Sequence, residues 1–266
     1  MAVGSAREQR AGEFAGRAGA ALVAGGTGGI GAAVVATLAR RGSAVVFTYR
    51  SNRSAADALA ARLTADGLPV HAVAADLTSE READAAVRNT CDRFGGLHTL
   101  VHAAGPHVPL IHLSRVPPAR YREQLHAEAE AFYNLAHPAL AALRESGGSG
   151  VAVTTAATHR YPVRDGLSSG TKGAVEALVR AFAAEEGRYG VRFNCVGPGM
   201  LTDGNAARLV DSGELDADAL AVTRRNIPLR RFGRAQDVAE AVAFLASDRA
   251  GFITGQHLAV DGGYTV

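Results

Sequence analysis

The stretch LVAGGTGGIGAAVV, residues 22–35, joins an apolar run to an amphipathic segment through a glycine-rich turn. The apolar run that ends at Gly25 predicts a buried strand, and the segment that follows predicts a helix. Gly25, Gly29 and Gly31 let the backbone turn tightly and approach a pyrophosphate, to which the helix N-terminus presents free N–H groups and a favourable dipole. The order of strand, turn and helix therefore favours a dinucleotide site over an ordinary glycine turn.

The rest of the chain repeats this alternation of short apolar runs and longer helical patterns. The runs look buried rather than alternating between apolar and polar residues, which is typical of strands in a parallel sheet covered on both faces. Helices between such strands indicate βαβ units with right-handed crossovers and a doubly wound α/β fold. Strands are expected at 20–25, 43–49, 69–77, 98–105, 149–157, 191–199 and 256–263, a long helix at Pro118–Glu145, and a further helix from Ser169 onward.

The chain reads as one folded unit with short additions. We expect a flexible N-terminal tail over residues 1–18, a single domain over 19–266 and a lid-like surface insertion near 201–226. A chain of 266 residues is ample for the core of one large α/β domain. No repeat or low-complexity segment suggests a second domain.

The charge, cysteine and histidine content of the chain limits the kinds of ligand and binding partner that are expected. The net charge of +2, with no basic run, gives no support for nucleic acid or an acidic membrane surface. Cys91 and Cys195 lie far apart, which suits a reducing compartment, and the nine histidines lack carboxylates at ligand spacing, so no metal site is expected. The N-terminus has no apolar stretch, and no segment is long and apolar enough to span a bilayer. We therefore expect a cytoplasmic protein that acts on a small molecule.

The end of the second expected strand, VVFTYRSN, indicates which dinucleotide is bound. A ribose with a free 2′-hydroxyl is usually met at this point by Asp or Glu. Tyr49 and Arg50 stand here instead, followed by Ser51 and Asn52. An arginine suits a 2′-phosphate through its charge and its fork of donors. The sequence therefore favours NADPH over NADH.

Several motifs occur in an order that resembles the short-chain dehydrogenase/reductase family, from about Ala20 to the C-terminus. They are the turn Ala24–Gly31, the pair Asp76–Leu77, the run His102–Gly105, the turn Pro198–Gly199 and the segment 227–263. The resemblance implies a single Rossmann-like domain with a seven-stranded parallel sheet flanked by helices, NADP(H) as the cofactor, and a homodimer or homotetramer. It also implies cofactor contacts at Gly25, Thr27, Gly28, Gly29, Ile30, Gly31, Arg50, Ser51, Asp76, Leu77, Ala103, Ala104, Gly105, Lys172, Pro198, Gly199 and Leu201.

The catalytic positions depart from the family pattern of Asn, Ser, Tyr and Lys. Lys172 is kept, but Ser168 stands four residues earlier, where the family has tyrosine; the two share a face if the helix begins early enough. By the same resemblance, the family serine corresponds to Thr155 or Ala156, with the spacing favouring Thr155, and the family asparagine corresponds to Glu128. A serine hydroxyl is far too weak an acid to replace tyrosine as a proton donor in ketone reduction.

The SxxxK pattern resembles the 2,4-dienoyl-CoA reductase branch of the family, which reduces a conjugated C=C. In that reaction negative charge collects on the thioester oxygen as an enolate, which needs hydrogen-bond donors more than a strong acid. The resemblance implies that Ser168 or Thr155 donates to this oxygen while Lys172 holds the nicotinamide ribose.

Two positions around this pattern leave alternatives open. The branch has an acidic tyrosine after the fifth strand where this chain has Ala157. Tyr161 or His159, on the loop that follows, could supply the proton instead, although an aromatic residue on a loop is more often a packing or surface residue. Glu128 either pairs with Lys172, acts as an acid or base in a dry site, or is solvated on a shifted helix.

The leading hypothesis is an NADPH-dependent reductase with an atypical active site. Its substrate would carry an activated C=C or C=O, as in an enoyl- or oxoacyl-thioester, free or bound to CoA or a carrier, or a similar secondary metabolite, with C=C slightly favoured. One alternative is conventional carbonyl reduction with Tyr161 or water in place of the missing acid. Another is the same fold reused without hydride transfer, as a cyclase, an isomerase or a regulatory NADPH-binding subunit. The loss of three catalytic positions favours this last alternative, whereas the retained Lys172 and cofactor turn oppose it.

Overall fold

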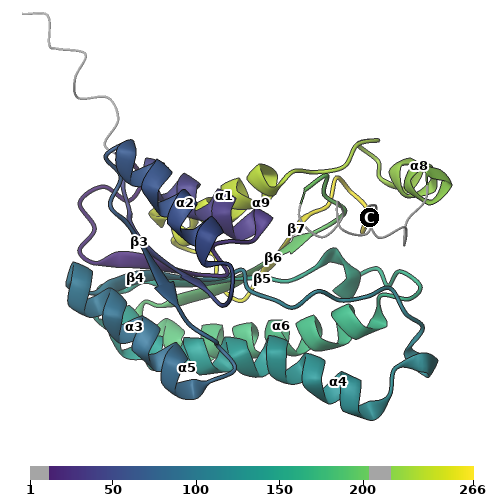
Figure 1. Ribbon diagram of the computed structural model, residues 1–266, viewed down its shortest axis with the longest axis horizontal. Coiled ribbons are helices and arrows are strands. Elements are labelled where there is room, and N and C mark those ends of the chain that lie inside the picture. The colour runs from purple at the N-terminus through teal and green to yellow at the C-terminus, as the bar shows by residue number, and fades with distance from the viewer. Residues whose placement is uncertain (1–11, 204–216) are drawn as a thin grey trace, which may run out of the picture.

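Seven strands form one parallel sheet in the order β3-β2-β1-β4-β5-β6-β7 (Figure 1). The computed structural model describes residues 12–203 and 217–266. Every residue of β1, β4 and β5 is buried, which explains why these strands are apolar along most of their length. The strands are β1 Ala20–Ala24, β2 Ala44–Tyr49, β3 Val70–Ala74, β4 Leu97–His102, β5 Ser149–Val153, β6 Arg192–Pro198 and β7 His257–Val260.

Helices cover both faces of the sheet (Figure 1). One layer contains α1, α2 and α9, and the opposite layer contains α3, α5 and α6. A π-helical turn, His126–Glu130, joins α4 to α5 without interrupting the helical path. The helices are α1 Gly29–Arg40, α2 Arg53–Ala65, α3 Glu80–Phe94, α4 Pro118–Leu125, α5 Ala131–Ser146, α6 Gly166–Glu186, α8 Ala217–Asn226 and α9 Ala235–Ala246.

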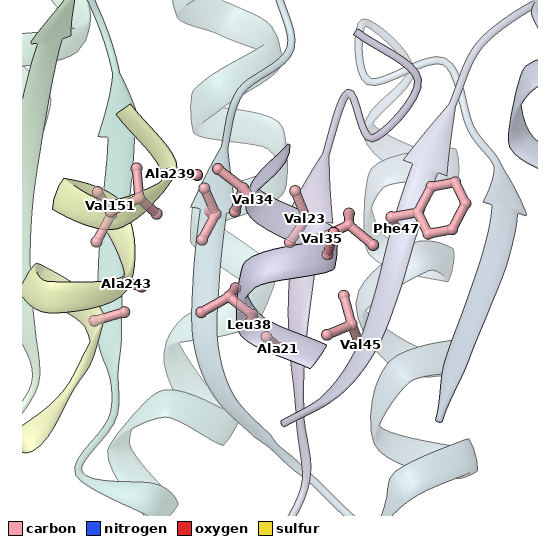
Figure 2. Close-up of a cluster of buried hydrophobic side chains, with 14 of the residues drawn as sticks. Ala21, Val23, Val34, Val35, Leu38, Val45, Phe47, Val151, Ala239 and Ala243 are labelled. Atoms are coloured by element: carbon pink, nitrogen blue, oxygen red, sulfur yellow. The ribbon is translucent and has the colours of Figure 1, made fainter. Parts of the chain in front are cut away.

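The core on the α1 and α9 side consists mainly of branched and small side chains, together with Phe14 and Phe47 (Figure 2). Val34 and Leu38 of α1 pack between the strands and α9, which presents Ala239 and Ala243. These side chains are fully buried, and burying a valine or leucine contributes about 1.5–3 kcal/mol. The alanines on α9 let the two helices approach closely, so α1 is held firmly where it begins beside the sheet.

The strand order reverses direction at β1, which lies between β2 and β4. The chain first builds outward through β2 and β3, and then returns to the other side of β1 with β4. In open parallel sheets the crevice at such a switch point, outside the carboxyl ends of the strands, is where ligands bind. The predicted fold, a doubly wound Rossmann-like domain with seven parallel strands, is confirmed.

The predicted flexible tail is wrong for residues 12–18. Phe14 is 1% exposed, and its N–H donates to the carbonyl of Arg41 at 3.0 Å. Its ring also stacks on that of His98, with the ring centroids 6.0 Å apart. The mixed charges around Phe14 concealed this single anchoring side chain, which makes the segment part of the domain.

Two further expectations change in detail. The helix that carries Lys172 begins at Gly166 rather than Ser169, because the fully buried Leu167 anchors an earlier first turn. Within the predicted insertion near 201–226, α8 is a helix, while 204–216 lies outside the described residues. No helix among the described residues is long and apolar enough to cross a membrane.

Candidate active site

The glycine-rich turn fits against the ends of β2 and β4. Gly25 has φ +77°, and a Cβ there would lie 2.7 Å from the Cα of Ala104. A Cβ on Gly31 would lie 2.1 Å from the carbonyl oxygen of Gly25. The N–H of Gly26 donates to the carbonyl of Thr48 at 2.9 Å, which fixes the turn to β2. Glycine is therefore required here by conformation and by close packing.

The N-terminus of α1 is open to a ligand. Its N-cap, Gly28, has no side chain, and Thr27 and Gly29 beside it are partly or fully exposed. The first N–H groups of a helix, here those of Gly29, Ile30 and Gly31, have no acceptor within the helix. Together with the helix dipole, these donors suit a pyrophosphate, as the sequence predicts.

Arg50 and Asp76, predicted to contact the cofactor, lie just beyond the ends of β2 and β3. Arg50 and Ser51 are exposed just beyond β2. The Asp76 carboxylate accepts hydrogen bonds from the backbone N–H and the hydroxyl of Thr78, at 3.1 and 2.8 Å. The Thr78 side chain is the main cause of the lowered pKa of Asp76, to which the positive charge of Arg50 also contributes. Arg50 and Asp76 are thus close enough to interact electrostatically.

Leu77 follows β3, and Ala103 and Ala104 form the turn after β4. The Leu77 side chain is buried, and its carbonyl accepts a hydrogen bond from Asn134 Nδ2 at 3.1 Å. Ala103 and Ala104 are partly exposed, and the N–H of Ala103 donates to the carbonyl of Ala24 at 3.1 Å. The turn after β4 is therefore tied to the end of β1, directly beside the glycine-rich turn.

Lys172 and Glu128 form an ion pair at the centre of the site. Lys172 Nζ donates to Glu128 Oε1 at 2.6 Å, and the side chains are 16% and 1% exposed, respectively. Gly105 lies against the pair, because a Cβ there would be 3.1 Å from Glu128 Oε2 and 3.6 Å from Lys172 Nζ. Of the alternatives for Glu128, pairing with Lys172 is the one present in the structure.

The π-helical turn explains how Glu128 reaches Lys172. An inserted residue in such a turn redirects the side chains of a helix, and these turns occur frequently at functional sites. The other carboxylate oxygen, Oε2, is buried and has no hydrogen-bond partner among the described residues. An acceptor left open in this way faces the space beside Gly105, where a ligand donor would satisfy it.

Ser168 and Thr155 are the two residues with aliphatic hydroxyl groups among the predicted catalytic positions. Because α6 begins at Gly166, Ser168 lies one helical turn before Lys172 on the same face. The Thr155 hydroxyl follows β5 and accepts a hydrogen bond from the Ala157 N–H at 3.2 Å. Its own proton remains available to a ligand oxygen. Ala157 itself is buried.

Asp165 is a site residue that sequence reasoning missed. It occupies the N-cap of α6 but makes no side-chain capping bond. Burial raises its pKa to about 6, and the positive charge of Lys172 opposes this shift. The signal was an Asp immediately before a helix, and it was missed because the helix was expected to begin later.

His102 lies beneath the ion pair as a neutral ring. Both of its ring nitrogens are buried without a hydrogen-bond partner in the described chain, and the ring meets Phe132 edge-on at 5.4 Å. Burial, helped by the charge of Lys172, lowers its pKa to about 3. His102 therefore contributes no charge to the site at neutral pH.

The structure does not bring the two loop candidates to this centre. Tyr161 is 72% exposed on the loop before α6. His159 packs instead against His257, with the ring centroids 4.1 Å apart. The expectation that Tyr161 or His159 supplies the missing proton is not supported by where their side chains lie.

The segment after β6, where cofactor contacts are predicted, packs closely against the end of β7. Gly199 packs closely on Asp261, since a Cβ there would lie 2.8 Å from the Cβ of Asp261. The Gly199 N–H donates to the carbonyl of Val260 at 3.0 Å, directly after Pro198. Leu201 forms an isolated bridge with Gly233 and buries its side chain.

Comparison with known proteins identifies the family to which this geometry belongs. Residues 24–265 match the family model described as enoyl-(acyl carrier protein) reductase. An A-factor type gamma-butyrolactone 1'-reductase (1S-forming) of Streptomyces virginiae is 36% identical over 253 residues, which cover 92% of this chain and 95% of that protein. The chain belongs to the short-chain dehydrogenase/reductase family. It is therefore assigned to a family of oxidoreductases that bind a nicotinamide cofactor.

Solved structures of family members share the whole domain. A short-chain type dehydrogenase/reductase from Mycobacterium ulcerans superposes with a TM-score of 0.88 at 30% identity, covering 95% of this chain and 90% of that one. A short-chain dehydrogenase from Burkholderia cenocepacia, determined in complex with NADP, superposes with a TM-score of 0.85 at 28% identity. That alignment covers 97% of this chain and 100% of the other.

Proposed function

We propose that this chain is an NADPH-dependent reductase that acts on an activated C=C or C=O. Enoyl- or oxoacyl-thioesters, free or bound to CoA or a carrier, and similar secondary metabolites are the substrate class, and we favour the C=C. The observation that carries the proposal is the arrangement at the crevice. Ser168 lies one turn from Lys172, which Glu128 holds at 2.6 Å beside Gly105.

The choice of NADPH rests on Arg50. It is exposed just beyond β2, and neither Tyr49 nor Ser51 beside it offers the carboxylate that would bind a free ribose 2′-hydroxyl. A guanidinium can bind a 2′-phosphate through two parallel hydrogen bonds. The NADP found in the Burkholderia cenocepacia relative is consistent with this choice.

The hydroxyl groups suit the stabilisation of a substrate oxygen. A bound NADPH supplies the hydride, and the protein handles the oxygen and the proton. Ser168 and Thr155 donate hydrogen bonds to an enolate oxygen, whose charge is spread over carbon and oxygen. Lys172, fixed by Glu128, binds the nicotinamide ribose.

Asp165 is our candidate for the proton donor. With a pKa of about 6, roughly a tenth of it carries a proton at pH 7, far more than for an ordinary aspartate. It stands at the start of α6, within electrostatic reach of Lys172. Conventional carbonyl reduction is a second candidate function, because the Asp165 carboxyl would then act as the proton donor in place of the missing tyrosine.

The first test is a titration with NADPH and NADH that follows nicotinamide fluorescence. Tight binding that prefers NADPH supports the proposal, whereas no binding of either cofactor would overturn the oxidoreductase function and favour a reused fold. Turnover on enoyl-thioesters and ketones is then compared for Ser168→Ala and Ser169→Ala. Ser169 is a matched control, because its hydroxyl contacts the Gly166 carbonyl within its own helix at 3.4 Å. Only the Ser168 variant is expected to lose activity, and equal activity of the two variants would contradict the role of Ser168.

We also propose that the chain self-associates through an apolar groove between α4, α5 and α6. The groove has a volume of about 950 Å³ and lies on the opposite face of α6 from Lys172. Its lining includes Tyr133, Ala177 and Leu178. Ala177→Glu should shift the mass measured by light scattering toward the monomer, while Ala61→Glu on the exposed side of α2 should not. A monomeric parent protein would contradict the proposal.

A further inference from the structure

Three potential metal ligands converge at the β7 edge of the domain, outside the crevice. His159 follows the short helical turn after β5, Glu176 lies in the middle of α6, and His257 begins β7. One ligand atom from each of the three lies within 4.8 Å of the others. They come from distant parts of the chain, which is why sequence spacing predicted no metal site.

The contacts among these side chains are those of a preformed cluster. His257 Nε2 is 3.5 Å from Glu176 Oε1, which is long for a hydrogen bond. The rings of His159 and His257 lie 4.1 Å apart at an angle of 30°. The Thr158 hydroxyl donates to Glu176 Oε1 at 2.7 Å, and so fixes the carboxylate as second-layer groups commonly do around a metal.

The cluster contains a buried nitrogen atom that a bound ligand would satisfy. The side chains of His257 and Glu176 are 9% and 5% exposed, yet His257 Nε2 has no hydrogen-bond partner in the described chain. An unpartnered imidazole nitrogen buried beside a carboxylate is well placed to bind a metal ion.

We propose that His159, Glu176 and His257 bind a divalent transition-metal ion, with Zn²⁺ as the best fit. Two imidazoles, one carboxylate and a water form a common four-coordinate zinc set. Bond lengths of about 2.0–2.2 Å place tetrahedral ligand atoms roughly 3.4 Å apart, close to the separation of His257 and Glu176. His159 is exposed on a loop, so a small movement of its side chain completes the set.

The proposed ion links the segments that carry the active site. Glu176 lies one turn beyond Lys172 on the same face of α6, and His159 follows Thr155 by four residues. A metal bound here ties α6 and the loop after β5 to β7. Its expected role is to fix the positions of Thr155 and Lys172 rather than to take part in the reduction.

The test is isothermal titration of Zn²⁺ into the full-length protein after chelation and removal of any histidine tag. One Zn²⁺ per chain with micromolar or tighter affinity is expected, with a rise in melting temperature. Co²⁺ in the same site should give the visible absorption of a four- or five-coordinate ion. Affinity weaker than about 100 µM would overturn the proposal, because two imidazoles and a carboxylate in a preformed site bind far more tightly.

Variants separate this site from adventitious binding. His257→Gln and His159→Ala should each weaken Zn²⁺ binding at least tenfold, whereas His112→Gln, at an exposed histidine on another loop, should leave it unchanged. His159 is exposed, so its variant is expected to fold even if the buried one does not. Zn²⁺ affinity that is unchanged in His159→Ala, or reduced equally in His112→Gln, would refute the assignment. NADPH binding measured on the same samples keeps this outcome separate from that of the proposed function.

Discussion

Replacing Glu128 by leucine would remove the carboxylate that Lys172 Nζ contacts at 2.6 Å. Lys172 would keep an ammonium group that is only 16% exposed, with its charge no longer paired. Removing one partner of a buried ion pair typically destabilises a protein by about 3–5 kcal/mol. Because the Lys172 side chain stays partly exposed, we expect a loss near the lower end of this range, about 3 kcal/mol.

The assay is denaturant unfolding at neutral pH and at one fixed protein concentration. The matched control is Glu123→Leu on α4, whose carboxylate is 66% exposed and pairs with Arg120 at 3.2 Å. That exposed pair should contribute about 0.5 kcal/mol or less. Adding Lys172→Met to Glu128→Leu should restore most of the stability, because no unpaired charge remains. Equal effects of the two leucine variants, or a double variant as unstable as Glu128→Leu alone, would refute the reasoning.

Three further predictions concern the acid, the turn and the cofactor. The pKa of Asp165 is raised from 3.8 to about 6, so ionising this carboxyl in the folded protein lowers the free energy of unfolding. This loss of stability is absent below pH 3.8 and complete above pH 6. Asp165→Asn should therefore stabilise the protein by up to about 3 kcal/mol at pH 8 but not at pH 4, as measured by denaturant unfolding. A gain in stability that does not depend on pH would contradict this. Gly31→Ala should abolish NADPH binding in a fluorescence titration, because its Cβ would meet the Gly25 carbonyl, whereas Gly173→Ala, in open space on α6, should bind normally. Arg50→Ala should weaken NADPH roughly tenfold to a hundredfold and leave NADH unchanged in the same titration, and equal losses would exclude Arg50 as the phosphate ligand.

The fold was predictable because its signals are local. Strands β1 to β6 are short runs rich in apolar residues, and each is followed by a helix. Gly25 and Gly31 mark the first strand–helix turn unambiguously. Phe14 shows where local signals fail, since one buried aromatic side chain in a charged segment has no periodicity to reveal it. The early start of α6 was missed for a similar reason, because Leu167 anchors it by a tertiary contact.

The sequence indicated where the candidate site residues lie along the chain, but not how they pair or which of them are charged. Lys172, Ser168 and Glu128 could each be located along the chain, yet their pairing depends on a π-helical turn that no sequence period reveals. The states of Asp165 and His102 depend on burial, which is a property of the folded chain. The cluster around Glu176 is invisible in sequence, because its members come from three separate elements.

The charges of the assembled site bear on the bond that is reduced. A lysine ammonium about 4 Å from a substrate oxyanion contributes about 4 kcal/mol at an effective dielectric constant of 20, but a carboxylate at a similar distance opposes it. Glu128 lies 2.6 Å from Lys172, so the pair presents almost no net charge. His102 is neutral, and Asp165, when it is not protonated, adds a negative charge. The remaining donors are the hydroxyls of Ser168 and Thr155. The carboxylate that fixes Lys172 therefore also weakens it as a partner for a localised oxyanion, and this is why we favour an enolate over an alkoxide at this site.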